Sequence, residues 1–155
     1  MNTPPALSFP APRPATPADL EALLVLENAC FEFNRMGRRS FRRLLERPSA
    51  RILVIDGPAG LAAGAVLLSR AGTRGLRLYS LATHPDHRGQ GLAVRMVEAA
   101  LAHTRDSGHQ WLSLEVHPGN AAARALYHRL GFHQVSVEED YYADGSYAFR
   151  LRRLV

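Results

Sequence analysis

The chain has 155 residues, 46% hydrophobic and 21% charged, which predicts one globular domain over 1–155 with a sizeable core. Arginine supplies all 19 strongly basic residues and the formal net charge is +5, but without interleaved aromatic residues or a nucleic-acid module we expect no nucleic-acid partner. The sequence has no run of about 18 apolar residues, no basic-then-apolar leader, and a single cysteine, Cys30, without a disulfide partner. These features predict a cytoplasmic protein with no membrane partner, in which Cys30 is a buried core thiol.

The first half of the chain predicts four strands and two helices. Residues 1–6 are expected to fray, and the prolines near the N-terminus leave room only for an edge strand over about 7–13. A helix over 15–31 follows with Thr16 as N-cap, and a second helix opens at Ser40 and stops before Pro48. Residues 51–56 and 61–70 predict a hairpin, and 76–83 predict the next strand.

The second half alternates strands and helices before ending in a hairpin. Helices are expected over 91–107 and 120–130, and strands over 110–116, 132–139 and 146–154, with an Asp144-Gly145 turn before the last strand. The order β-α-α-β-β-β-α-β-α-β-β predicts an α/β fold that mixes hairpins with helical crossovers.

The stretch HPDHRGQGLA, residues 84–93, joins a predicted strand to a predicted helix. Helix N-termini attract anions, because their first amides have no intrahelical acceptor, and glycine lets the backbone approach a phosphate closely. Gly89 and Gly91 therefore suggest a pyrophosphate cradle, although two glycines that merely ease a tight turn are the alternative. The spacing is neither that of a P-loop nor that of a dinucleotide fingerprint.

The remaining charged clusters are less specific. The seven histidines form no compact metal-ligand set on one helix, so no metal is predicted. Six arginines lie between Arg35 and Arg47. They either flank an acidic ligand or, as the simpler interpretation, form a solvent-exposed helix face.

Two motifs point to a known family: Arg88-x-x-Gly91-x-Ala93 after the strand LYSLAT, and LSLEVHPGNAAARALYHRLGF with Asn120 and Tyr127. Through them the chain resembles the GNAT superfamily of N-acetyltransferases over about residues 12–152, most specifically over 76–133. Within that superfamily, the pattern followed by YYADG is most similar to ribosomal-protein alanine N-acetyltransferases and their relatives that acetylate protein N-termini. The resemblance implies a mixed, mostly antiparallel sheet with helices on both faces, and acetyl-CoA as co-substrate.

The resemblance also implies roles for individual residues. Glu115 would be the general base and Tyr127 the general acid toward the leaving thiolate. Acetyl-CoA would contact the third strand, the glycine turn and the last helix through Leu81, Ala82, Thr83, Arg88, Gly89, Gln90, Gly91, Leu92, Ala93 and Asn120. The acceptor would contact Tyr141, Tyr142 and His117. His117 and the Ser146-Tyr147 pair depart from the commonest pattern, which leaves the acceptor open.

The residues themselves allow simpler interpretations beside these roles. Strand alternation puts Glu115 on one face with Trp111 and Ser113, where it is either a base or the solvated end of the strand. Tyr127 is either a proton donor or a core tyrosine with its hydroxyl at the surface. His117 precedes a proline and is either a cleft residue or a surface histidine.

Three functions therefore remain open for the chain. It is expected to acetylate a primary amine, with the α-amine of a peptide or protein as the leading acceptor. A small amine, such as a polyamine, an amino acid or an aminoglycoside, is the second candidate. A non-catalytic acyl-CoA-binding module is the third. The sequence leaves open whether the protein is a monomer or a homodimer.

Overall fold

The computed structural model describes residues 8–155, so the frayed segment predicted at 1–6 lies outside the described residues. The predicted edge strand over 7–13 is wrong in its bounds. Strand β1 is confined to Arg13–Pro14, where it pairs with Val54 and Leu53. Proline has no amide hydrogen to donate to a ladder, and the chain has prolines at 10, 12 and 14, so the pairing is short.

The helices in the described residues follow the predicted order. They are α1 (Leu20–Cys30), α2 (Arg38–Glu46), α3 (Leu92–Asp106) and α4 (Ala121–Arg129). A 3-10 turn precedes α1, in which the Asp19 carboxylate accepts the Thr16 amide hydrogen at 2.8 Å. The predicted start of α2 at Ser40 is two residues late, because Gly37 caps the helix in an extended conformation and Arg38 pairs with Glu21 on α1. None of the helices within residues 8–155 is long and apolar enough to cross a membrane.

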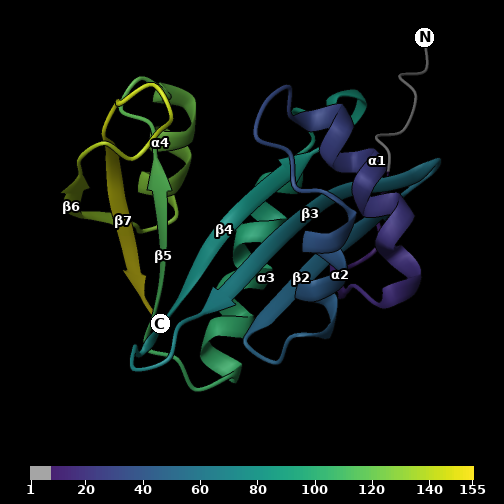
Figure 1. Ribbon diagram of the computed structural model, residues 1–155, viewed down its shortest axis with the longest axis horizontal. Coiled ribbons are helices and arrows are strands. Elements are labelled where there is room, and N and C mark those ends of the chain that lie inside the picture. The colour runs from purple at the N-terminus through teal and green to yellow at the C-terminus, as the bar shows by residue number, and fades with distance from the viewer. Residues whose placement is uncertain (1–7) are drawn as a thin grey trace, which may run out of the picture.

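The remaining strands complete a seven-stranded sheet with the order β1-β2-β3-β4-β5-β7-β6 (Figure 1). They are β2 (Ala50–Gly57), β3 (Gly60–Ser69), β4 (Gly75–Thr83), β5 (Trp111–Val116), β6 (His133–Glu138) and β7 (Ala148–Leu154). Strand β7 begins two residues after the predicted Ser146, because the Asp144 carboxylate holds the Ser146 amide in a turn at 2.9 Å. The predicted mixed, mostly antiparallel sheet is confirmed, since only β4 and β5 run parallel.

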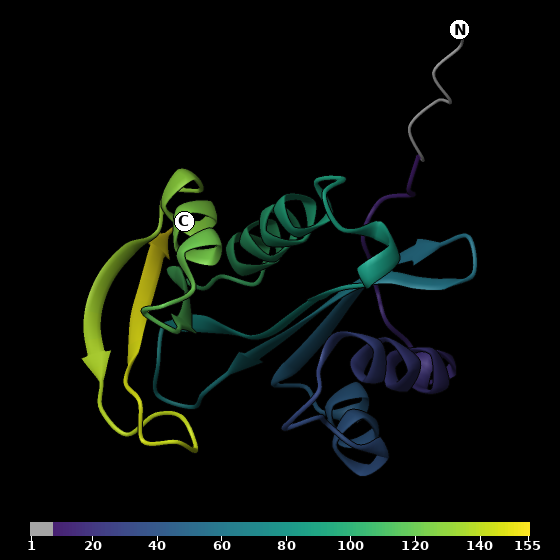
Figure 2. The same ribbon diagram turned by 90° about the horizontal axis from the view of Figure 1, so that it is seen from above.

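Helices cover both faces of the sheet, as predicted. Figure 2 shows α1 and α2 on one face and α3 and α4 on the other. One core cluster packs α3 against the sheet through Met96, Val97 and Leu101, and a second packs α1 and α2 through Leu23, Leu26 and Phe41. Packing on the two apolar faces of the sheet therefore fixes where α1, α2 and α3 begin and end relative to the strands.

The sheet opens between β4 and β5. These strands pair only at their beginnings, where residues 75–77 lie beside 111–113, and then diverge (Figure 1). Beyond Arg77, β4 keeps its ladder with β3 on one side, while its other edge faces the opening. A strand edge without a neighbour presents amide and carbonyl groups to whatever enters the gap.

Candidate active site

The turn before α3 has the backbone conformation that its glycines predict. Gly89 and Gly91 both adopt φ of 78°, in the left-handed region, and Gly91 is the N-cap of α3. The first helical bond joins the Arg95 amide to the Gly91 carbonyl at 3.1 Å, so the preceding amides have no acceptor inside the helix. The turn therefore has the geometry of an anion cradle, and phosphate binding there stays a prediction.

A hollow of about 480 Å³ lies against this turn, and we call it the glycine-turn hollow. It gathers every predicted cofactor residue except Gln90: Leu81, Ala82, Thr83, Arg88, Gly89, Gly91, Leu92, Ala93 and Asn120. Tyr127 lines it as well. Residues that are separated along the sequence thus meet where β4, α3 and α4 converge.

Cys30 also borders the glycine-turn hollow and is only partly buried, which the prediction of a core thiol missed. Its Sγ lies 3.3 Å from the Thr83 carbonyl oxygen, which also accepts a hydrogen bond from Arg88 Nε at 3.3 Å. Burial raises the pKa of the Cys30 thiol, so the group stays protonated at neutral pH. A protonated thiol is a poor nucleophile, which argues against a covalent role for Cys30.

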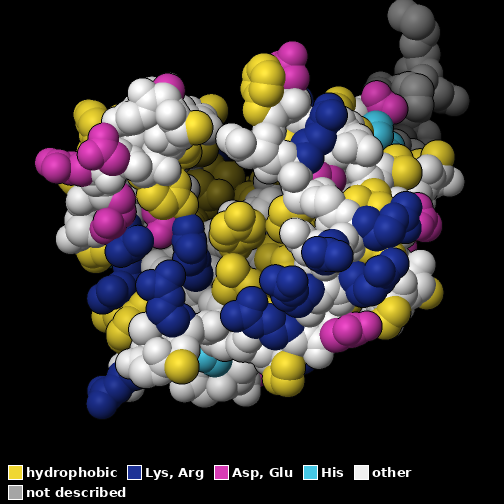
Figure 3. Space-filling view, viewed as in Figure 1, with side chains coloured by type: hydrophobic (Ala, Val, Ile, Leu, Met, Phe, Trp, Pro, Cys, Tyr) yellow, Lys and Arg dark blue, Asp and Glu magenta, His cyan; other side chains and the backbone are white. Residues whose placement is uncertain are grey.

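A second hollow of about 380 Å³ occupies the opening between β4 and β5, and we call it the central hollow. It brings together four of the predicted catalytic and acceptor residues, namely Glu115, His117, Tyr127 and Tyr142. Leu81, Asn120 and Tyr127 line both hollows, so the two adjoin one another. Figure 3 shows this part of the surface hollowed, with a hydrophobic floor.

Tyr127 combines the two interpretations that its sequence position allows. Its side chain is 8% exposed and packs edge-on against Phe132, with ring centroids 5.5 Å apart, so it belongs to the core. It also lines both hollows. Burial raises the pKa of Tyr127 to about 12, so the phenol is protonated at neutral pH and can donate a hydrogen bond.

Glu115 is a buried ion-paired carboxylate, which excludes the solvated strand end. Its side chain is 4% exposed, with Oε2 at 2.9 Å from Arg77 Nε and Oε1 at 3.0 Å from Arg150 Nε. The burial of β5 alternates as predicted, so Glu115 lies opposite Leu112 and Leu114. Each carboxylate oxygen of Glu115 thus accepts a hydrogen bond from one guanidinium.

The segment between β6 and β7 contains the predicted turn, in which the Gly145 amide donates to the Tyr142 carbonyl at 2.9 Å. The Tyr142 ring packs 5.2 Å from that of His117, beside the central hollow. Tyr141 does not line this hollow. Its hydroxyl accepts a hydrogen bond from Arg77 at 2.7 Å, and its ring meets the Tyr142 ring edge-on.

Arg77 and Arg150 are the site residues that sequence analysis missed. Each contacts Glu115 from a neighbouring strand, because β5 lies between β4 and β7 and Glu115 is in register with Arg150. No local sequence signal identifies these pairs, since they depend on which strands become neighbours.

Taken together, the fold places the glycine turn, the open edge of β4 and the two hollows beside one another. Residues 20–132 match the model of the acetyltransferase (GNAT) family, and the chain belongs to this family.

Two curated relatives and one solved structure are similar to the chain. The [ribosomal protein bS18]-alanine N-acetyltransferase of Escherichia coli K12 is 38% identical over 65 residues, 42% of this chain and 44% of that protein. The enzyme of the same name from Salmonella typhimurium LT2 is 30% identical over 125 residues, 80% of this chain and 81% of its own. The crystal structure of the Escherichia coli ribosomal-protein-S18-alanine N-acetyltransferase has a TM-score of 0.82 and 25% identity, covering 94% of this chain and 93% of that one. The sequence match to the first relative thus spans less than half of its length.

Proposed function

We propose that the protein transfers an acetyl group from acetyl-CoA to the α-amine at the N-terminus of a peptide or protein. The observation that carries this proposal is that Glu115 and Tyr127 line one hollow, which adjoins the glycine turn. Acyl transfer from a thioester to an amine is assisted by a group that accepts the proton of the amine and a group that donates toward the departing sulfur, and a carboxylate and a phenol can fill these roles. The names of the relatives, which specify an alanine acceptor on a ribosomal protein, support an N-terminal amine.

In this proposal acetyl-CoA lies along the glycine-turn hollow. Its pyrophosphate accepts hydrogen bonds from the free amides at 89–93, and the pantetheine arm runs along the open edge of β4 at Leu81–Thr83. The side-chain oxygen of Asn120 already accepts the Ala123 amide at 3.1 Å, so its amide nitrogen is the group that can donate to the cofactor.

The acceptor amine attacks the thioester carbonyl carbon, and the C–S bond then breaks. Glu115 receives the proton that the amine loses, and Tyr127 donates toward the departing sulfur. A coenzyme thiol resembles a free thiol with a pKa of about 8.5, whereas the Tyr127 pKa is about 12, so complete transfer of the phenolic proton costs about 5 kcal/mol. Tyr127 therefore acts mainly as a hydrogen-bond donor while the bond breaks, and solvent completes the protonation.

Glu115→Gln should lower kcat/KM for a peptide acceptor by about tenfold at pH 7 and much less at pH 9. An α-amine has a pKa of about 7.7 to 8.0, so at pH 9 most of it is already neutral and needs no base. Initial rates from pH 6 to 9.5 measure the difference. The same loss at every pH would instead mean that Glu115 acts only by holding Arg77 and Arg150.

Tyr142→Ala should raise KM for the peptide by about fivefold or more while KM for acetyl-CoA stays within about twofold. Tyr142 borders the central hollow on the side away from the glycine turn, so the lost contact is with the acceptor alone. Steady-state rates with each substrate varied in turn measure both constants. Tyr147→Ala is the matched control, because Tyr147 is 46% exposed and lines neither hollow. A parallel rise in both constants would contradict an acceptor-specific role.

The experiment that tests the proposed function is a screen of N-terminal peptides and small amines with acetyl-CoA, read by thiol release and by product mass. The chain contains no lysine, so internal amines of the protein add no background. Acetylation of peptides at their N-terminal amine would support the proposal. Turnover of polyamines, amino acids or aminoglycosides alone supports the small-amine alternative, and acetyl-CoA binding without any turnover supports the non-catalytic module.

A further inference from the structure

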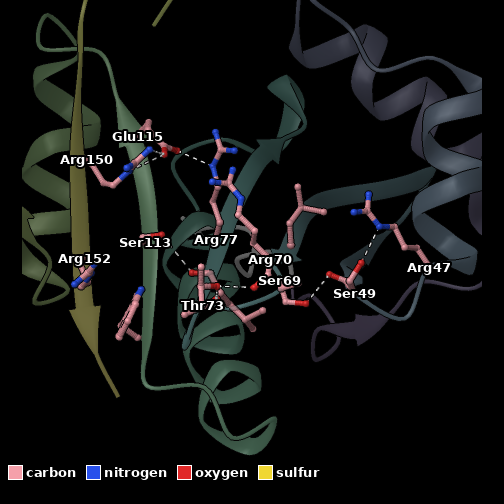
Figure 4. Close-up of a pocket in the computed structure, with 15 residues that line it drawn as sticks. Arg47, Ser49, Ser69, Arg70, Thr73, Arg77, Ser113, Glu115, Arg150 and Arg152 are labelled. Atoms are coloured by element: carbon pink, nitrogen blue, oxygen red, sulfur yellow. Dashed lines mark hydrogen bonds and ion pairs between the residues drawn. The ribbon is translucent and has the colours of Figure 1, made fainter. Parts of the chain in front are cut away.

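A third hollow, of about 470 Å³, lies beyond Glu115 from the central hollow, and we call it the arginine pocket (Figure 4). Strands β3, β4, β5 and β7 and the C-terminal end of α2 contribute to it. Its lining includes five arginines, namely Arg47, Arg70, Arg77, Arg150 and Arg152, and a single carboxylate, Glu115. Figure 3 shows arginine side chains gathered on this face of the molecule.

The charge of the arginine pocket is not neutralised by its own residues. Glu115 is occupied by Arg77 and Arg150, and Arg150 also pairs with Glu138 at 2.9 Å. Arg47, Arg70 and Arg152 form no ion pair with a carboxylate within residues 8–155.

Arg152 is held in place by Trp111 and keeps one hydrogen-bond donor without a partner. Its guanidinium lies 4.2 Å from the centre of the Trp111 ring, which fixes its orientation. Its Nε is buried without a hydrogen-bond acceptor in the described part of the chain. A buried donor without an acceptor lowers the stability of the fold. An anion that binds here would be attracted by the charge of Arg152 and would supply the missing hydrogen-bond acceptor.

The arginine pocket adjoins the reaction site through Glu115, which lines both hollows. In the β5–β7 ladder Glu115 is opposite Arg150 and Ser113 is opposite Arg152, so the pocket extends along the strands away from the central hollow. Two residues of strand correspond to about 7 Å, and an extended peptide advances about 3.3 Å per residue. A peptide with its amine beside Glu115 would thus reach the level of Arg152 at about its third residue, and Arg70 and Arg47 line the same pocket.

We propose that the acceptor carries acidic side chains at about its third to fifth residues, which bind in the arginine pocket. This inference rests on the proposed function and specifies its substrate class. Arginines spread along an open pocket can bind several carboxylates on an extended chain, since each guanidinium can form a bidentate pair with one carboxylate. A nucleic acid fits less well, because Arg152 already covers the Trp111 ring on which a base would stack.

Three peptides with alanine first and Glu, Gln or Lys at positions 3–5 test the inference. With the native protein, we expect kcat/KM for the Glu peptide to exceed that for the Gln peptide by about tenfold, and the Lys peptide to be the poorest. The variant Arg47→Gln/Arg70→Gln should reduce the Glu-to-Gln ratio to about two. Both arginines are exposed, so their replacement spares the core. Arg105→Gln/Arg129→Gln removes the same charge from exposed positions on α3 and α4 and should keep the tenfold ratio.

Each contrary outcome has a distinct meaning. Equal rates with the Glu and Gln peptides would overturn this inference and leave the proposed function standing. An acidic preference that survives in Arg47→Gln/Arg70→Gln would overturn the assignment to the arginine pocket. Tight binding of a short single-stranded RNA, lost in that variant, with no acidic preference among the peptides would overturn it in favour of nucleic acid. Failure of all peptides as acceptors would overturn the proposed function and this inference together.

Discussion

Replacing Tyr127 with phenylalanine should lower kcat by about 100-fold or more while Kd for acetyl-CoA stays within about twofold. The phenylalanine ring can keep the edge-on contact with Phe132, so packing is retained and only the hydroxyl is lost. That hydroxyl is protonated at neutral pH because burial raises the Tyr127 pKa to about 12. The departing thiolate then leaves without its donor. Single-turnover rates and calorimetry with acetyl-CoA separate the chemical step from binding.

Tyr147→Phe serves as the control for Tyr127→Phe, because it removes a hydroxyl from an exposed ring that packs on Phe149. It should leave kcat within about twofold. Thermal unfolding should show the Tyr127 variant to be folded, since the hydroxyl forms no hydrogen bond with another residue within 8–155. A Tyr127→Phe enzyme with native kcat would assign this side chain to the core alone.

Gly91→Val should weaken acetyl-CoA binding by about 30-fold. The φ of 78° at Gly91 is strained for any residue with a Cβ, and most of all for a branched one. The turn must shift to relieve this strain, which moves the free amides of α3 away from the phosphates. Loss of about 2 kcal/mol of charge-assisted hydrogen bonding corresponds to that factor in Kd. Calorimetry with acetyl-CoA measures it directly.

Gly108→Val separates this effect from backbone strain alone. Gly108 has φ of 80° and open space around it, as Gly91 does, but it follows the other end of α3. Both variants should therefore lose similar stability, while only Gly91→Val loses affinity for acetyl-CoA. Equal affinities in the two variants would remove the glycine turn from phosphate binding.

The features that the sequence predicted well are those encoded over short distances. The helix at 91–107 and the strand at 110–116 are each predicted by their own periodicity, and the glycine turn is predicted by the ten residues that contain it. The family resemblance then linked Glu115 to Tyr127, which periodicity alone cannot do. The short β1 and the early start of α2 were missed because proline-limited pairing and the Arg38–Glu21 contact depend on neighbours elsewhere in the chain.

The arginine pocket could not be predicted for a related reason. Arg47, Arg70 and Arg152 lie far apart in the sequence and meet only after β5 pairs with β4 across a helical crossover and β7 returns to β5. Among 19 arginines, nothing local distinguishes these three from solvent-exposed ones. Sequence analysis instead emphasised the run from Arg35 to Arg47, of which only Arg47 reaches the pocket.

The divergence of β4 from β5 also bears on how such a site can change over evolutionary time. The open edge of β4 offers main-chain amides and carbonyls, which persist whatever side chains mutation introduces there. The surfaces that would meet an acceptor consist of side chains, from Tyr142 to the arginine pocket, and each can be replaced singly. Descendants of one ancestral gene can thus change the acceptor that they bind while the main-chain groups of β4 stay the same.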